Sequence, residues 1–117
     1  MLELICTDTC NTCRHLVRLL ERDGIVYRYR EYRKEPLSVE EIRRVLALLG
    51  LGPREVLRRH DRAFRDLKLT GGEPDDELIR LMSEHPTLLQ RPIGIFEGRA
   101  IIGRPPQKVL ELVGMPA

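Results

Sequence analysis

Apolar and polar residues alternate near both ends of the chain, and this pattern predicts β-strands there. Leu2, Leu4 and Cys6 share one side of the first alternation, which ends at the polar stretch 7–9. A second strand is expected over residues 25–32, where β-branched and aromatic residues alternate with charged ones. Residues 92–96 and 99–102 flank a tight turn, so the sequence predicts a β-hairpin near the C-terminus.

Between these strands, apolar residues recur at helical spacing. The first helix is expected to begin at Cys10 and to end before Gly24, because glycine favours a left-handed cap. A second helix is expected to begin after Ser38, since Glu41 three residues later completes a capping-box pattern. The remaining predicted helices follow Pro53, span residues 75–84 and follow Pro105-Pro106, and residues 67–74 are expected to form a loop.

The predicted order is β-α-β, then a block of helices, then β-β-α, with a cysteine where the first strand meets the first helix. This order is typical of a thioredoxin-like domain with helices inserted between its two halves. We therefore expect the α/β class, with a mixed four-stranded sheet. A chain of 117 residues favours one domain over residues 1–117, with the helical insertion at about 37–84.

Charge and hydropathy limit which binding partners and which cellular compartment are expected for this protein. Twenty Lys and Arg against 18 Asp and Glu leave a formal net charge of +2, which is too small to favour nucleic acid or a membrane surface. The sequence has no run of roughly 18 apolar residues, and no signal-peptide pattern precedes Leu2. We therefore expect a cytoplasmic protein with no nucleic-acid partner and no membrane partner.

All three cysteines, Cys6, Cys10 and Cys13, lie within the first thirteen residues. A structural disulfide framework would spread its cysteines along the chain to close long loops. His15 and His60 stand at no spacing from the cysteines that resembles a zinc site. The cluster therefore favours chemistry at sulfur, with no metal.

Cys10-Asn11-Thr12-Cys13 is a C-x-x-C motif at the expected start of a helix. Free backbone N–H groups and the helix dipole stabilise a thiolate there, so Cys10 is expected to be the nucleophile. Cys13, about one turn further on, is expected to be the resolving thiol that closes a disulfide with Cys10. The plainer alternative is that both are small buried apolar residues.

Three neighbouring residues have competing interpretations. Cys6 continues the inward register of the first strand, so it is expected to be a buried, inert thiol, and a part as a third redox thiol is the alternative. His15 is expected on a solvated face, with a general-base role as its alternative. Arg14 adds positive potential near Cys10, whereas Asp8 acts in the opposite direction.

Three stretches resemble the arsenate reductase family of thioredoxin-like proteins, of the glutaredoxin-linked bacterial type, and its close relative, the Spx-type redox regulators of transcription. The similarity covers nearly the whole chain. The matching stretches are residues 9–14 (TCNTCR), Leu57-Arg58-Arg59, and residues 85–93 (HPTLLQRPI) followed by Gly103-Arg104-Pro105.

The resemblance implies that the Cys10 thiolate attacks arsenate while Arg58, Arg91 and Arg104 surround the oxyanion. Guanidinium groups suit this role because they offer paired donors to tetrahedral oxyanions. The resemblance also implies a cis Arg91–Pro92 bond, with Pro92 facing the reactive cysteine. It implies no bound cofactor, with glutathione or a dithiol protein such as glutaredoxin or thioredoxin as the reductant.

The chain combines features of both relatives. Glutaredoxin-linked reductases generally have one cysteine in this loop and a histidine shortly before it, whereas here Cys13 is present and Cys6 takes the earlier position. Spx-type regulators have the C-x-x-C but typically lack the last arginine, which is Arg104 here. The expected function is the reduction of arsenate to arsenite, in arsenic resistance. The alternatives are a redox-responsive regulator that binds RNA polymerase and is switched by a Cys10–Cys13 disulfide, and a general disulfide reductase.

Overall fold

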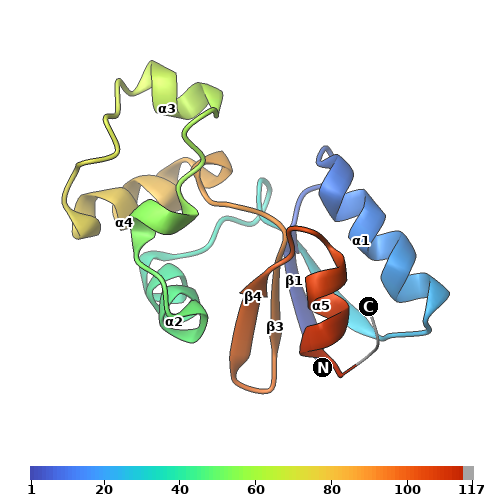
Figure 1. Cartoon of the computed structure of the whole chain (residues 1–117). Helices are drawn as coiled ribbons and strands as arrows, with labels where there is room; N and C mark the ends of the chain where they lie inside the picture. Colours follow the sequence, from blue (N-terminus) through green and yellow to red (C-terminus); the bar gives the residue numbers. More distant parts are fainter. Residues whose placement is uncertain (115–117) are drawn as a thin grey trace. The chain divides into compact units, whose positions relative to one another are not determined.

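The computed structural model describes residues 1–114, which form two compact units (Figure 1). The first unit, which we call the sheet unit, contains Met1–Tyr32 and the segment from Arg91 onward. The second, the helical unit, is Arg33–Gln90. The helical segment predicted from the sequence lies within the second unit.

The sheet unit contains a mixed four-stranded sheet, as predicted, and this α/β arrangement is thioredoxin-like. Its strands are β1 (Leu2–Cys6), β2 (Tyr27–Glu31), β3 (Ile93–Phe96) and β4 (Arg99–Ile102). They lie in the order β2-β1-β3-β4, with β1 parallel to β2 and antiparallel to β3. The predicted hairpin of β3 and β4 is confirmed. The second strand begins later than predicted, because Val26 precedes the ladder and is 69% exposed.

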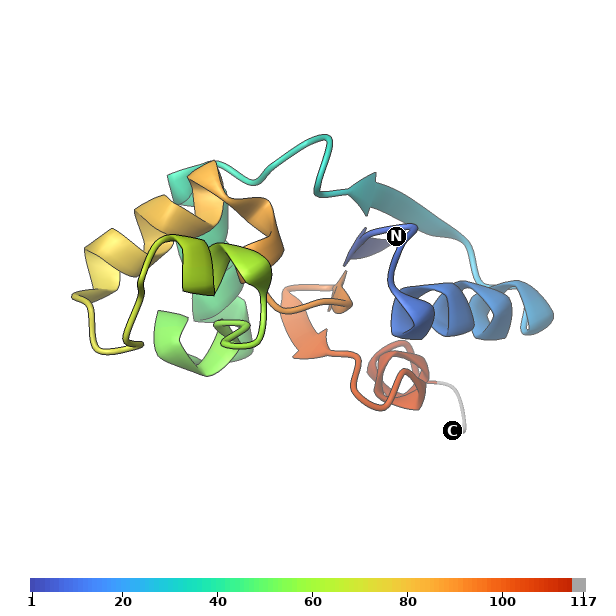
Figure 2. The same cartoon turned by 90° about the horizontal axis from the view of Figure 1, so that it is seen from above.

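Helices α1 (Asn11–Arg22) and α5 (Gln107–Leu112) cover one face of this sheet (Figure 2). Alternate residues of β1 supply the sheet side of the core, and the apolar stripes of the two helices supply the other side. The main members of this core are Leu2, Leu4, Cys6, Leu16, Leu20, Val109 and Leu110. The alternation at the start of the chain therefore sets which side chains of β1 join the core under α1 and α5, and it directs Cys6 into that core.

The helical unit is built from α2 (Val39–Leu49), η1 (Pro53–Val56), α3 (Arg62–Asp66), α4 (Asp75–Glu84) and η2 (Pro86–Leu88). The predicted capping box is present, because Ser38 Oγ accepts from Glu41 N and Glu41 Oε1 accepts from Ser38 N. Helix α2 packs against α4. Among residues 1–114, no helix is both long and apolar enough to cross a membrane.

Candidate active site

Cys10 lies at the junction of the first strand and the first helix, where it is the N-cap residue of α1. Its sulfur accepts a hydrogen bond from the backbone N–H of Cys13 at 3.5 Å. The first N–H groups of a helix have no partner within the helix, and they favour negative charge at this point. Only 7% of Cys10 is exposed, so the sulfur lies at the margin of the core and not in open solvent.

The loop that presents Cys10 is held by the neighbouring strand β2. Glu31, the register partner of Cys6, accepts from Thr7 Oγ1 at 3.1 Å and from the backbone N–H of Asp8 at 2.8 Å. Tyr29 donates its hydroxyl to Asp8 Oδ1 at 2.7 Å. Burial, together with this hydrogen bond, raises the pKa of Tyr29, so the phenol keeps its proton. Parallel strands end at the same edge of a sheet, which explains why β2 supplies these contacts.

Arg104 reaches the sulfur from the segment that follows β4. Its Nη2 lies 3.9 Å from Cys10 Sγ, and its Nε donates to the carbonyl of Arg91 at 2.9 Å. Gly103 allows the chain to pass closely here, because a Cβ atom at this position would lie 3.0 Å from both Pro92 Cγ and Val109 Cγ2. Two features therefore hold the guanidinium of Arg104 beside the sulfur. They are its hydrogen bond to the Arg91 carbonyl and the close packing of the backbone at Gly103.

Arg91 lies beside the same sulfur, and its Nη1 donates to the hydroxyl of the fully buried Tyr32 at 3.2 Å. Burial by itself lowers the pKa of Arg91, but hydrogen bonds with Tyr32 and Cys10 outweigh it, and the net shift is upward. The Arg91–Pro92 bond is cis, the isomer that the family resemblance implies. The Arg104–Pro105 bond is also cis, which the sequence did not indicate.

Cys6 and Cys13 are completely buried, and their thiol groups hydrogen-bond to each other. The hydrogen bond from Cys6 lowers the pKa of Cys13 to about 6, although burial acts in the opposite direction. The same hydrogen bond, together with burial, raises the pKa of Cys6. Cys6 therefore keeps its proton and donates it toward the Cys13 sulfur. The expected burial of Cys6 is confirmed, and its contact with Cys13 is a relationship that the strand pattern did not reveal.

The other candidate residues make contacts of their own. Arg58 belongs to the helical unit, where its guanidinium donates to Asp61 Oδ1 at 2.8 Å and to the carbonyl of Thr87 at 2.9 Å. His15 is on the exposed face of α1. Arg14 donates to the carbonyl of Asp8 at 3.2 Å and to Asn11 Oδ1, so its side chain reinforces the loop. Among residues 1–114, no group of three His, Cys, Asp or Glu side chains is arranged to hold a metal ion.

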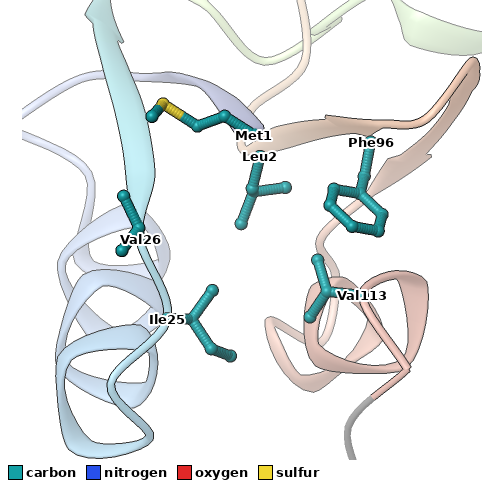
Figure 3. Close-up of a pocket in the computed structure, with 6 residues that line it drawn as sticks. All are labelled: Met1, Leu2, Ile25, Val26, Phe96 and Val113. Atoms are coloured by element: carbon teal, nitrogen blue, oxygen red, sulfur yellow. The ribbon is translucent and has the colours of Figure 1, made fainter.

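The sheet unit also has an apolar hollow of about 260 Å³ (Figure 3). It lies at the start of β1, at the opposite end of this strand from Cys6. The side chains that line it are Met1, Leu2, Ile25, Val26, Phe96 and Val113. All six side chains are apolar, and the hollow is separated from the cysteines by the length of β1.

Comparison with known proteins gives the family. A sequence model of the ArsC family matches residues 6–112. The arsenate reductase of Haemophilus influenzae is 35% identical over 106 residues, covering 89% of this chain and 91% of that protein. The global transcriptional regulator Spx of Bacillus subtilis is 35% identical over 104 residues, covering 88% of this chain and 79% of the regulator. The structure of an arsenate reductase from Vibrio cholerae matches with a TM-score of 0.87 and 36% identity, covering 94% of this chain and 95% of the other. The resemblance seen in the sequence is thereby confirmed, and the chain belongs to the ArsC family.

Proposed function

We propose that this protein is a thiol-dependent oxidoreductase that reduces arsenate to arsenite, with Cys10 as nucleophile. The observation that supports it most directly is the 3.9 Å distance between Arg104 Nη2 and Cys10 Sγ at the start of α1. An arsenate ion in contact with this sulfur would meet a guanidinium group on arrival. The relatives named arsenate reductase support the same assignment.

The chemistry requires two thiols and no metal. The Cys10 thiolate attacks arsenic, a sulfur–arsenic bond forms, and one arsenate oxygen leaves as water. Cys13 then attacks the Cys10 sulfur, and a sulfur–sulfur bond forms as the sulfur–arsenic bond breaks. The electron pair of the broken bond stays on arsenic, which changes from As(V) to As(III). The two thiols become a disulfide, and their protons end in water and in arsenite.

The arginines supply the positive charge that this reaction needs. Arsenate is a dianion at neutral pH, and bidentate guanidinium groups neutralise such oxygens. Arg104 and Arg91 both lie beside Cys10 in the sheet unit. Arg58 is proposed as the third anion ligand on the family motif alone.

The product disulfide has to be reduced before a second turnover. Cys13 is fully buried and Cys10 is slightly exposed, so an external thiol would attack Cys10. Glutathione, glutaredoxin or thioredoxin are the proposed reductants. If glutathione replaces Cys13 as the resolving thiol, a mixed disulfide with Cys10 forms instead, and glutaredoxin would reduce it.

A single-turnover experiment tests this proposal. Fully reduced protein, mixed with arsenate in the absence of any other thiol, is expected to yield up to one arsenite per chain, measured by chromatography. Cys13→Ser should give none until glutathione is added, and Cys10→Ser should give none under either condition.

Arg104→Leu is expected to slow arsenate turnover by about 10²–10³, the usual effect of losing one preorganised charge-stabilising donor. Arg28→Leu, at an exposed position of β2, serves as the matched control. Insulin reduction that is unaffected by Arg104→Leu, without arsenite formation, would identify a general disulfide reductase instead.

A second candidate function is a redox-responsive regulator that binds RNA polymerase. The placement of Cys13 directly beside Cys10 favours it, because such a pair suits a disulfide switch, and the Spx relative supports it. Binding to bacterial RNA polymerase should then differ between the reduced and the disulfide form. Cys10→Ala should remove that difference, whereas arsenite formation without any redox-dependent binding favours the reductase.

A further inference from the structure

The three sulfurs form a connected series with Cys13 in the middle. The backbone N–H of Cys13 donates to Cys10 Sγ at 3.5 Å, and Cys13 is buried in one core with Cys6, whose thiol hydrogen-bonds to the Cys13 sulfur. The backbone gives this order a simple origin. Cys6 ends β1, Cys10 caps α1, and Cys13 lies in the first turn of that helix, facing the core shared by the strand and the helix.

The reaction described above uses only two of these sulfurs. Cys6 is fully buried in the same core as the other two cysteines. A thiol that touches the resolving cysteine is in position to attack a disulfide formed there, because thiol–disulfide exchange requires contact with the sulfur that is attacked.

We propose that Cys6 is a third redox thiol, which takes over the disulfide from Cys10. The step rests on the proposed function, since it begins from the Cys10–Cys13 disulfide. The Cys6 sulfur attacks Cys13 Sγ, the Cys6–Cys13 bond forms, the Cys10–Cys13 bond breaks, and Cys10 leaves as a thiolate. The proton of Cys6 passes to solvent or to the departing sulfur. The number of disulfides does not change, so no further oxidant is needed.

Two features of the site favour this direction of exchange. The departing Cys10 thiolate faces Arg104 Nη2 at 3.9 Å and the guanidinium of Arg91, and a leaving thiolate is stabilised by positive charge. The Cys6 thiol is held protonated partly by its contact with an anionic Cys13. Once Cys13 is part of a disulfide it carries no charge, so that obstacle to Cys6 ionisation is removed.

As a consequence, the disulfide lies in the core, while Cys10 returns to its free thiol form. A Cys6–Cys13 disulfide would lie between two fully buried residues, whereas Cys10 would again be available to an anion or an alkylating agent. Reduction of the protein by an external dithiol would then have to pass back through Cys10.

The chain has three cysteines, so one disulfide leaves one free thiol, and the identity of that thiol shows which disulfide is present. All three cysteines lie on the tryptic peptide Met1–Arg14. Reduced protein is treated with one equivalent of diamide, quenched in acid after increasing times, denatured and alkylated, and the labelled cysteine is read from peptide fragmentation. We expect the label on Cys6 at early times and on Cys10 at late times. Iodoacetamide alkylation of Cys10 in the folded protein should be lost on oxidation and then return.

Cys6→Ala is the test variant, and it is expected to lose the return of Cys10 alkylation. The wild-type time course decides the question even if this variant does not fold. A label that stays on Cys6 at all times would overturn the relay and leave the Cys10–Cys13 disulfide of the proposed function intact. A label on Cys13 would mean a Cys6–Cys10 bridge, and it would overturn both. Because diamide oxidises thiols without arsenate, a failure of arsenate reduction is detected separately.

Discussion

The hydroxyl of Tyr32 accepts a hydrogen bond from Arg91 Nη1 at 3.2 Å, and this contact begins a series of side-chain contacts that ends at Cys10 Sγ. The carbonyl of Arg91 accepts from Arg104 Nε at 2.9 Å, and Arg104 Nη2 faces Cys10 Sγ. Tyr32 is completely buried, so the surrounding core holds its side chain in place. Tyr32 thus holds the side chain of Arg91, and the backbone of Arg91 in turn holds Arg104.

Tyr32→Phe is expected to weaken arsenate binding without changing the sulfur chemistry. Loss of a hydrogen bond to a charged group costs about 1.5 kcal/mol, so KM for arsenate should rise by roughly tenfold while kcat changes less. Tyr27→Phe is the matched control, because the Tyr27 hydroxyl bonds to Glu21 at the surface. Equal kinetic constants for the two variants would show that Tyr32 does not position Arg91.

Anions are expected to protect Cys10 from alkylation. Arsenate, phosphate and sulfate should each slow the reaction of Cys10 with iodoacetamide competitively, since each would bind Arg104 and occupy the space in front of the sulfur. Arg104→Leu should abolish this protection. Arg104→Lys should retain part of it, because an ammonium keeps the charge but lacks the bidentate fork. Undiminished protection in Arg104→Leu would remove the main support for the reductase and favour the regulator.

Gly103→Ala is expected to destabilise the fold and to displace Arg104. The new Cβ would lie 3.0 Å from Pro92 Cγ and from Val109 Cγ2, and forcing an extra carbon into a packed site costs about 1–3 kcal/mol. Urea unfolding measures the cost. Gly72→Ala, where the nearest atom lies at an ordinary 3.6 Å, should stay within about 0.5 kcal/mol of the parent protein.

The loop at residues 70–73 is expected to open in acid. The backbone N–H of Thr70 is the main cause of a lowered Glu73 pKa, and the N–H of Gly71 adds to it. A carboxyl whose pKa is lower in the folded state stabilises the fold above its unfolded pKa, and that contribution is lost as pH falls through the folded value. Amide hydrogen exchange at Thr70 and Gly71, corrected for intrinsic rates, should therefore accelerate in acid.

A variant that lacks the Glu73 charge tests whether this carboxylate causes the pH dependence. Glu73→Gln should already show fast exchange at these two amides at neutral pH and should lose most of the pH dependence. Glu77→Gln, an exposed position in the first turn of α4, should behave like the parent protein. A pH dependence that persists in Glu73→Gln would assign the effect to another group.

Local patterns predicted much of the fold and part of the candidate site. The alternation of β1, the capping box at Ser38 and the hairpin each depend on residues near one another in sequence, and all three are present. Helix α3 was not predicted, because it has only five residues and buries none of them. A helix without an apolar stripe leaves no periodic signal.

The supporting residues of the site could not be found in the same way. Tyr32 lies 59 residues before Arg91, and Glu31 lies 24 residues after Thr7, so no local spacing connects them. The parallel pairing of β1 and β2 is the only sequence-level signal for Glu31, since it places Glu31 opposite Cys6. The contact between Cys6 and Cys13 depends in turn on how α1 packs against β1, which the strand pattern alone does not fix.

The helical unit is inserted into the chain between Tyr32 and Arg91, and these two residues are joined side chain to side chain within the sheet unit. The chain therefore leaves the sheet unit after Tyr32 and returns to it at Arg91, and these two residues are hydrogen-bonded to each other. Because the cost of closing a loop grows only slowly with its length, a change in the length of the 33–90 segment is expected to cost little in loop closure while the Tyr32–Arg91 contact is kept.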